Sequence, residues 1–306
     1  MARPTTGEIV CRALQAGIAV PAFNIPYRPM MKPVVDALRD EQAFGLIAVA
    51  RLEWMKFEAG GLKEIMDEYR RVKDESYTRL HVDHVPVIDE DGLRVDYEPI
   101  MREAIELGYD SLMVDGSRLP LAENIAATCR VVEMAHAAGI AAEAELGAIM
   151  GHEHGPLPPY EELFKSGRGF TDPDDAARFV VETRVDWLSV AAGNIHGAIS
   201  AATRSQKKIT ARLSIERIEA IRRATGVPLV LHGGTGISKE CTMDAVRHGV
   251  AKINIATAIR QPYEAMRQKP AHEAATAVYD ATREILRNEL ELTGSAMKFG
   301  SIWVRP

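Results

Sequence analysis

The stretch "PLVLHGGTGIS", residues 228–238, joins a short apolar run to a glycine-rich turn and a serine that can cap a helix. This order is the repeating unit of a β/α protein. Similar apolar runs, each followed by a longer amphipathic stretch, occur at residues 19–24, 45–50, 79–85, 111–115, 140–147, 187–193 and 251–257. Because these runs are continuous rather than strictly alternating, they are typical of parallel strands covered on both faces.

Helix signals lie between the runs. Asp172 can cap a helix that Pro173 begins, and Ser214 can cap another that Gly226 ends. Eight strands, each followed by a helix, predict an α/β fold of the (β/α)8 TIM-barrel type. A doubly wound open sheet is the alternative, but no GxGxxG follows the first run.

No linker divides the 306 residues, so we expect a single domain over residues 1–306. The barrel would occupy about residues 19–260. The segment of about 261–306 would form extra C-terminal helices, broken near Pro270, that pack on the barrel or on another subunit. A homo-oligomer, dimer or tetramer, is expected.

Composition excludes several classes. The formal charge of −6 argues against nucleic acid, no stretch of about 18 apolar residues predicts a membrane span, and the first residues lack a secretory apolar core. Cys11, Cys129 and Cys241 are far apart and form no CxxC pair. They are interpreted as reduced thiols of a cytoplasmic protein.

Polar residues gather where the predicted strands end, the edge at which barrel enzymes build their sites. They are Asn24, Asp83, His84, Asp115, Glu145, His196, His232, Asn254 and Thr257. Three histidines at the ends of strands 3, 6 and 7 predict one catalytic Zn²⁺ site, which Co²⁺ or Fe²⁺ would also fit. Glu145 is a possible further ligand or partner of a ligand.

The glycine run after strand 7 offers backbone N–H groups for a phosphate, with Asn254 and Thr257 adding hydrogen bonds. A Gly- and Pro-rich segment, 151–169, has the composition of a functional lid, on which Glu153 would be a mobile base. Metal, phosphate and carboxylates together favour proton transfer beside a polarised carbonyl. A Schiff-base lysine is disfavoured, because Lys252 is near the start of its strand.

Many spaced blocks, in order, resemble the class II, metal-dependent ketose-phosphate aldolases, which include the fructose- and tagatose-bisphosphate enzymes. The blocks are "PAFN", "HVDH", "GYDSLMVDGSRLPLAENI", "EAELG", "TDPDDAARFV", "VAAGNIHG", "PLVLHGGTGI" and "VAKINIAT". The resemblance implies a lyase of carbohydrate metabolism that cleaves a phosphorylated ketose to dihydroxyacetone phosphate and an aldehyde.

Carried over by position, the resemblance implies that zinc binds His84, His196 and His232, with Glu145 beside it. Asp83 would exchange a proton with the substrate hydroxyl, and Glu153 with carbon. The substrate phosphate would lie against Gly197, Gly233, Thr235, Asn254 and Thr257, with Na⁺ or K⁺ nearby, and Asn24 and Arg260 would contact the rest of the substrate. Along the strand, His84 would point opposite to His81 and Asp83 and reach the metal by turning at the strand's end. His81 would be structural.

Three departures from the family concern the substrate. No lysine follows His196-Gly197 within a few residues, and Ala256 and Ala258 stand where fructose-bisphosphate members carry polar or acidic residues. The aldehyde half of the substrate is therefore left open. The alternatives are a non-catalytic or strongly diverged sugar-phosphate binder and, below it, a metal-dependent hydrolase.

Overall fold

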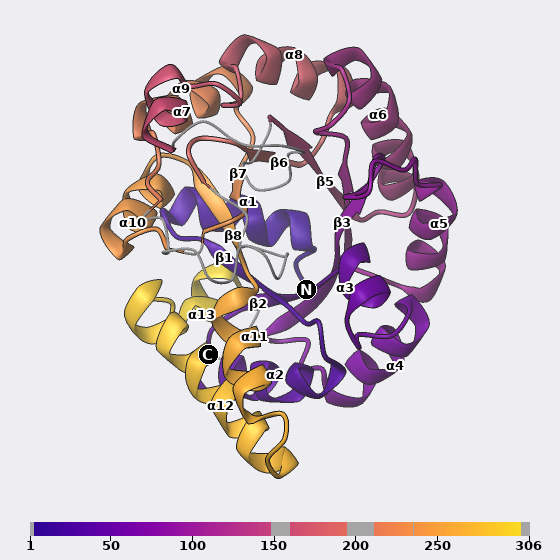
Figure 1. The fold of residues 1–306 in the computed structure, drawn as a ribbon, viewed down its shortest axis with the longest axis vertical. Helices are drawn as coiled ribbons and strands as arrows, with labels where there is room; N and C mark the ends of the chain where they lie inside the picture. Colours follow the sequence, from indigo (N-terminus) through magenta and orange to yellow (C-terminus); the bar gives the residue numbers. More distant parts are fainter. Residues whose placement is uncertain (1–2, 148–159, 195–210, 235, 301–306) are drawn as a thin grey trace.

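A computed structural model describes residues 3–147, 160–194, 211–234 and 236–300 of the chain. Eight parallel strands close into a barrel in chain order, and β1 pairs with β8 to complete the ring (Figure 1). The predicted TIM barrel is confirmed. The strands are β1 Val20–Asn24, β2 Gly45–Ala50, β3 Thr78–Pro86, β4 Ser111–Asp115, β5 Ala141–Leu146, β6 Trp187–Val190, β7 Leu229–Leu231 and β8 Val250–Ile255.

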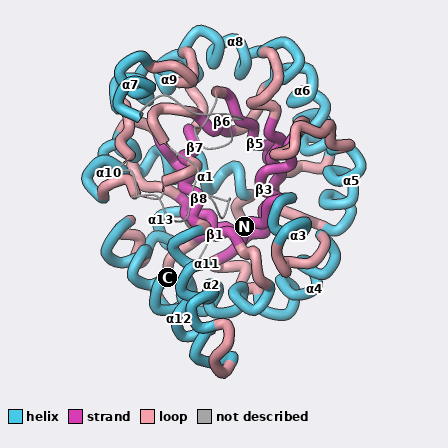
Figure 2. The backbone as a smooth tube through the Cα atoms, in the orientation of Figure 1, coloured by secondary structure: helices cyan, strands magenta, loops and turns pink. Residues whose placement is uncertain are grey.

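Helices surround the barrel, as the tube in Figure 2 shows. The α-helices are α1 Thr6–Ala16, α2 Met31–Asp40, α3 Arg51–Lys56, α4 Leu62–Val72, α5 Tyr97–Leu107, α6 Leu121–Ala137, α7 Tyr160–Ser166, α8 Pro173–Thr183, α9 Ile215–Thr225, α10 Lys239–Arg247, α11 Thr257–Met266, α12 Ala271–Glu284 and α13 Ser295–Phe299. Two short segments, η1 Arg28–Met30 and η2 Ile285–Glu289, are a 3₁₀ and a π turn. None of the described helices is long and apolar enough to cross a membrane.

The predicted helix signals are confirmed at the helices that flank the last strands. Asp172 accepts hydrogen bonds from the backbone N–H groups of Asp174 and Asp175 at the start of α8. Ser214 caps α9, which ends at Gly226 with a φ of 73°. Ser238 caps α10. These ends fix where each chain segment turns back to the barrel.

Helix α1 is an addition to the predicted elements, and it closes the amino-terminal end of the barrel. Its residues Ile9, Val10 and Ala13 are fully buried in one apolar cluster with Trp187 of β6 and Phe299 of α13. The larger cluster lies between the strands and the outer helices. With this end filled by apolar side chains, a binding site is expected at the carboxyl end of the strands.

The C-terminal helices are anchored by one buried carboxylate. Helix α12 packs on α2 and α11. At the end of α2, Glu41 accepts hydrogen bonds from Arg283 Nε at 2.6 Å and Arg287 Nε at 2.7 Å. Burial alone would raise the pKa of Glu41, but the two guanidinium groups hold it below its ordinary value. The ion pairs therefore tie α12 and η2 to the barrel.

We predict that Glu41→Gln lowers the free energy of unfolding at pH 7 by about 1–2 kcal/mol, because the charged acceptor for Arg283 and Arg287 is lost. A carboxylate with a depressed pKa stabilises the fold above its unfolded pKa and loses that effect as the pH falls. The wild-type advantage in urea unfolding should therefore shrink between pH 6 and pH 3.5. Glu284→Gln, on the exposed face of α12, is the matched control. An advantage for wild type that is the same at both pH values would contradict this account.

Candidate active site

Two histidines meet at the carboxyl end of the barrel. His84 Nε2, from β3, lies 2.5 Å from His232 Nδ1, which follows β7. Asp83 supplies a carboxylate oxygen to the same group, whose three ligand atoms all lie within 4.8 Å of one another. Residues 84 and 232, far apart in sequence, are thus brought together by the closure of the barrel.

Strand β3 does not keep the regular alternation that the sequence predicts. Between Val82 and Val85 it advances three residues, while the paired β4 advances two, from Leu112 to Val114. The extra residue is a β-bulge, and His84 takes a φ of 33°, which is rare for a residue with a side chain. His84 and Asp83 therefore reach one site, as expected, but a bulge within β3 brings them together rather than a turn at the strand's end.

The hydrogen-bond partners of the two rings are compatible with a bound cation. His84 Nδ1 lies 3.3 Å from Asp115 Oδ2, and His232 Nε2 lies 2.9 Å from Glu143 Oε1. If each of these nitrogens carries the proton toward its carboxylate, the lone pairs of the other two converge at 2.5 Å. Two lone pairs repel each other at that distance unless a proton or a metal ion lies between them. The donor set therefore fits a metal ion.

Glu145 lies beside the histidines, as expected from its place in β5. Its Oε2 is 3.6 Å from His232 Nδ1 and 4.0 Å from His84 Nε2, and it accepts a hydrogen bond from Ser189 Oγ at 3.1 Å. Burial, and next the charge of Asp115, raise the pKa of Glu145 to about 8. A nearby cation would favour its ionised form, so Glu145 is suited to join or support the ligand set.

Asp83 is held by two side-chain amides. Asn24 Nδ2 donates to its Oδ2 at 2.8 Å and Asn254 Nδ2 to its Oδ1 at 2.9 Å. Burial alone would raise the pKa of Asp83, but neighbouring His84, His232 and Lys252 keep it well below its ordinary value. Asp83 is therefore ionised and fixed in orientation.

Asn24 is shared with a second carboxyl group, that of Glu53 at the start of α3. Its Nδ2 lies 3.5 Å from Glu53 Oε2, which also accepts from the Ala50 N–H at 2.8 Å. Burial raises the pKa of Glu53 to about 8. This residue was not among the predicted site residues.

The residues expected to bind phosphate are only partly described. Gly233 follows β7 with a φ of 65°, and Thr257 is the first residue of α11. The Asn254 side chain instead donates from Nδ2 to Asp83 and accepts at Oδ1 from Lys252 Nζ, at 2.7 Å. His196, Gly197, Thr235 and Glu153 lie outside the described residues, so their predicted roles stay predictions.

Arg260 lies on α11 and is engaged within its own helix. Its Nη1 donates to both carboxylate oxygens of Glu264 at 2.8 Å. Glu264 also accepts a hydrogen bond from Tyr27 at 2.9 Å. The predicted contact of Arg260 with a distal part of the substrate stays a prediction.

Glu143 and Lys252 were not among the predicted site residues. They lie deeper in the barrel than the histidines, toward its amino-terminal end. Lys252 Nζ is 2.8 Å from Glu143 Oε2, and both side chains are fully buried. One signal was available: Glu143 and Glu145 are two apart in an apolar strand, and so face the same side. A buried carboxylate facing inward requires a cationic or donor partner, which Lys252 provides.

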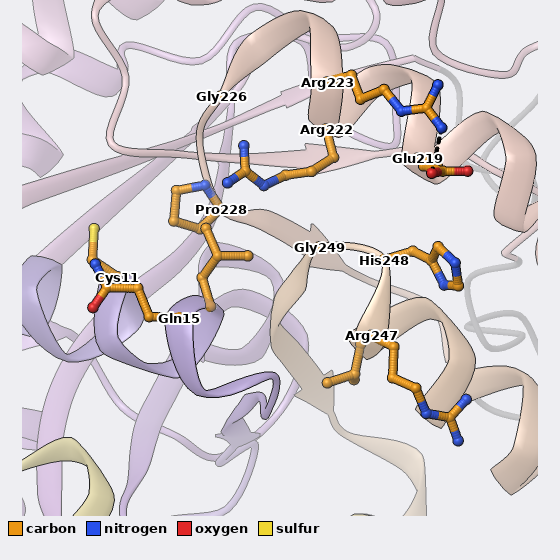
Figure 3. Close-up of a pocket in the computed structure, with 12 residues that line it drawn as sticks. Cys11, Gln15, Glu219, Arg222, Arg223, Gly226, Pro228, Arg247, His248 and Gly249 are labelled. Atoms are coloured by element: carbon orange, nitrogen blue, oxygen red, sulfur yellow. Dashed lines mark hydrogen bonds and ion pairs between the residues drawn. The ribbon is translucent and has the colours of Figure 1, made fainter.

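A separate pocket of about 650 Å³ lies at the amino-terminal end, between α1, α9 and α10 (Figure 3). Pro228 and Gly249, which line it, precede β7 and β8. Arg222, Arg223 and Arg247 give it a basic wall. It therefore opens at the end of the barrel opposite to Asp83 and the histidines.

The sequence matches the family described as class-II fructose-bisphosphate aldolase over residues 4–298. This chain belongs to that family. The fructose-bisphosphate aldolase of Streptococcus pyogenes serotype M1 is 33% identical over 292 residues, covering 94% of this chain and 85% of that protein. The probable fructose-bisphosphate aldolase of Bacillus subtilis is 28% identical over 304 residues, covering 96% of each.

Solved structures of aldolases share the fold. The YdjI aldolase from Escherichia coli K12 superposes with a TM-score of 0.75 at 27% identity, covering 95% of this chain and 98% of that one. The aldolase of Campylobacter jejuni, at 18% identity and a TM-score of 0.68, supports the fold alone. Membership in the class-II aldolase family indicates an aldehyde-lyase, and the family's metal dependence agrees with the donor set at His84 and His232.

We predict that His84→Ala and His232→Ala each weaken binding of a divalent metal by more than about 100-fold. Loss of a group that only supports a ligand costs about 10- to 100-fold in metal affinity, and loss of the ligand itself should cost more. Chelator competition on protein stripped of metal measures this directly. His248→Ala is the control, because His248 lines the pocket at the other end of the barrel. Wild-type affinity in either donor variant would remove that histidine from the metal site.

Proposed function

We propose that the protein is a zinc-dependent aldolase that reversibly cleaves a phosphorylated ketose to dihydroxyacetone phosphate and an aldehyde. The observation that carries the proposal is the convergence of His84 Nε2 and His232 Nδ1, 2.5 Å apart, beside an amide-clamped Asp83. His196 would complete the ligand set, with Glu145 joining or supporting it. Nitrogen donors favour Zn²⁺ over Mg²⁺, while Co²⁺ and Fe²⁺ also fit such a site.

When bound to these residues, the ion would act as a Lewis acid that polarises the carbonyl group of the ketose. Asp83 accepts the proton of the C4 hydroxyl as the C3–C4 bond breaks, which releases the aldehyde. The electron pair of that bond remains on C3 of the dihydroxyacetone phosphate half. Glu153 then delivers a proton to this carbon.

The phosphate of the substrate would lie across the ends of β7 and β8. Its partners are Gly197, Gly233, Thr235, Asn254 and Thr257, and a monovalent cation, Na⁺ or K⁺, would help to hold it. Asn254 contributes mainly through Asp83, given its bonds. Asn24 would face the substrate from β1, and Arg260 would bind its distal part. We further propose one domain that assembles into a dimer or tetramer.

For the aldehyde half of the substrate, we give more weight to the positions at which this sequence departs from the family pattern than to the names of the relatives. Ala256 and Ala258 supply no polar group at the end of β8, and no lysine follows Gly197 closely. The proposal is therefore aldol cleavage of a phosphorylated ketose, with fructose 1,6-bisphosphate as one member of the panel to be tested.

We predict that protein stripped of metal regains cleavage of at least one ketose phosphate when Zn²⁺ is restored. Asp83→Asn should keep its metal yet lose about 10²–10⁴-fold in kcat, the usual contribution of a general base. A coupled assay for dihydroxyacetone phosphate measures both.

The two parts of this prediction fail differently. Equal rates with and without metal across the panel would contradict the zinc-dependent lyase. Full activity in Asp83→Asn would leave the lyase standing but remove Asp83 from proton transfer. Tight ketose-phosphate binding without any turnover would favour a non-catalytic binder.

A further inference from the structure

Lys252 is a fully buried ammonium group for which the reaction described above has no task. It lies within β8, paired across the barrel seam with Val20 of β1, and has no exposed surface. Its Nζ contacts two groups, Glu143 Oε2 at 2.8 Å and Asn254 Oδ1 at 2.7 Å. A buried charge with two such partners costs desolvation and calls for an explanation.

The first consequence concerns the direction of the Asn254 amide. A lysine ammonium can only donate hydrogen bonds, so the atom that faces Lys252 must be the amide oxygen. The amide nitrogen is then forced to the other side, where it donates to Asp83 Oδ1 at 2.9 Å. The ionised Asp83 carboxylate only accepts hydrogen bonds, so it requires the same orientation of the amide. Without Lys252, the amide oxygen loses its donor and the side chain is held from the Asp83 side alone.

The second consequence concerns how Lys252 itself is held. Glu143 accepts from Lys252 and from Trp187 Nε1 through Oε2, the latter at 2.5 Å, while its Oε1 faces His232 Nε2. Neighbouring Lys252 and His232 keep the pKa of Glu143, which burial alone would raise, below its ordinary value. The ammonium is thus fixed by a carboxylate that also contacts a metal-binding histidine.

Two other uses of this cluster are less well supported. His81, Asp83 and Glu143 place one ligand atom each within 4.8 Å of one another, which suggests a second metal site. The ammonium of Lys252 already contacts the Glu143 oxygen and supplies the cation there. A Schiff base would need an uncharged, exposed amine, and Lys252 has neither exposure nor freedom from its carboxylate.

We propose that Lys252 is a positioning residue that fixes the orientation of the Asn254 amide and thereby holds Asp83 for proton transfer. The inference rests on the proposed role of Asp83. The Lys252 ammonium contacts Asn254 and Glu143 and reaches Asp83 through Asn254. Its charge also lowers the pKa of Asp83, and the double-mutant cycle below separates that effect from positioning. Glu143 holds the ammonium group in place through its ion pair with Lys252.

The test is the Lys252→Met variant, which keeps the length of the side chain and removes the charge. We expect kcat to fall about 100-fold, the effect of a small misplacement of a catalytic group, while KM and zinc affinity stay within about 10-fold. Collapse of the site would instead lower zinc affinity and kcat together. A kcat within about threefold of wild type would overturn the proposal.

A double-mutant cycle with Asn254→Ala separates this role from a general effect of charge. If Lys252 acts through Asn254, the double variant loses little more than either single variant. Losses that multiply would overturn the proposal. Ile253→Val, on the same strand but in the outer apolar cluster, is the matched control and should keep wild-type kcat.

Lys252→Met leaves the Glu143 carboxylate buried without its ammonium partner, which disfavours folding. The Lys252→Met/Glu143→Gln variant provides a neutral pair. Its kcat should stay about 100-fold below that of Glu143→Gln alone, because the amide has still lost its donor. Recovery to within about threefold of Glu143→Gln would count against Lys252 as a positioning residue.

Crystal structures of metal-free wild type and Lys252→Met test the geometry without any assay. The proposal predicts that the Asp83 Oδ1–Asn254 Nδ2 contact opens beyond about 3.5 Å in the variant. An unchanged contact would refute it. If zinc-loaded wild type cleaves no ketose phosphate, the proposed function fails, while this comparison still decides the role of Lys252.

Discussion

The bulge in β3 is the constraint on which the site depends. A regular strand places neighbouring side chains on opposite faces, so it could offer either Asp83 or His84 to the barrel's carboxyl end. The extra residue between Val82 and Val85, with a φ of 33° at His84, turns both inward. Such backbone strain persists only where the surroundings hold it, here through Asp115 on His84 Nδ1.

Below the histidines, the barrel buries a connected set of charges. His232 contacts Glu143, Glu143 contacts Lys252, Lys252 contacts Asn254 and Asn254 contacts Asp83. In a region shielded from water, burying any of these groups without its partners would cost free energy. The partners therefore hold each side chain in one orientation. The same contacts that satisfy the buried charges also orient His232 and Asp83, the proposed metal donor and the proposed proton acceptor. Fold and chemistry therefore share these interactions.

The sequence predicted the barrel because its signals are local. Apolar runs, Asp172 and Ser214 as helix caps and Gly226 as a helix end are each visible within a few residues. It also placed Asp83, His84, His232 and Glu145 together, since all end strands of one barrel. The bulge was not predictable from "RLHVDHVPV", because it appears only when β3 pairs with β4. The position of Lys252 near the start of its strand was predicted, but its contact with Glu143 of β5 was not, because that contact forms only when the barrel closes.

The central claim is that this end of the barrel activates a proton on the carbon next to a carbonyl, beside a bound metal. Deuterium exchange into dihydroxyacetone phosphate tests it most directly, because the exchange requires no aldehyde partner. NMR spectroscopy of the compound incubated in D₂O with the zinc-loaded protein follows the reaction. The account predicts that one hydrogen at C3 is replaced with the zinc-loaded protein and none after chelation. Failure of the metal-loaded protein to exchange that hydrogen with Zn²⁺, Co²⁺ or Fe²⁺ would contradict it.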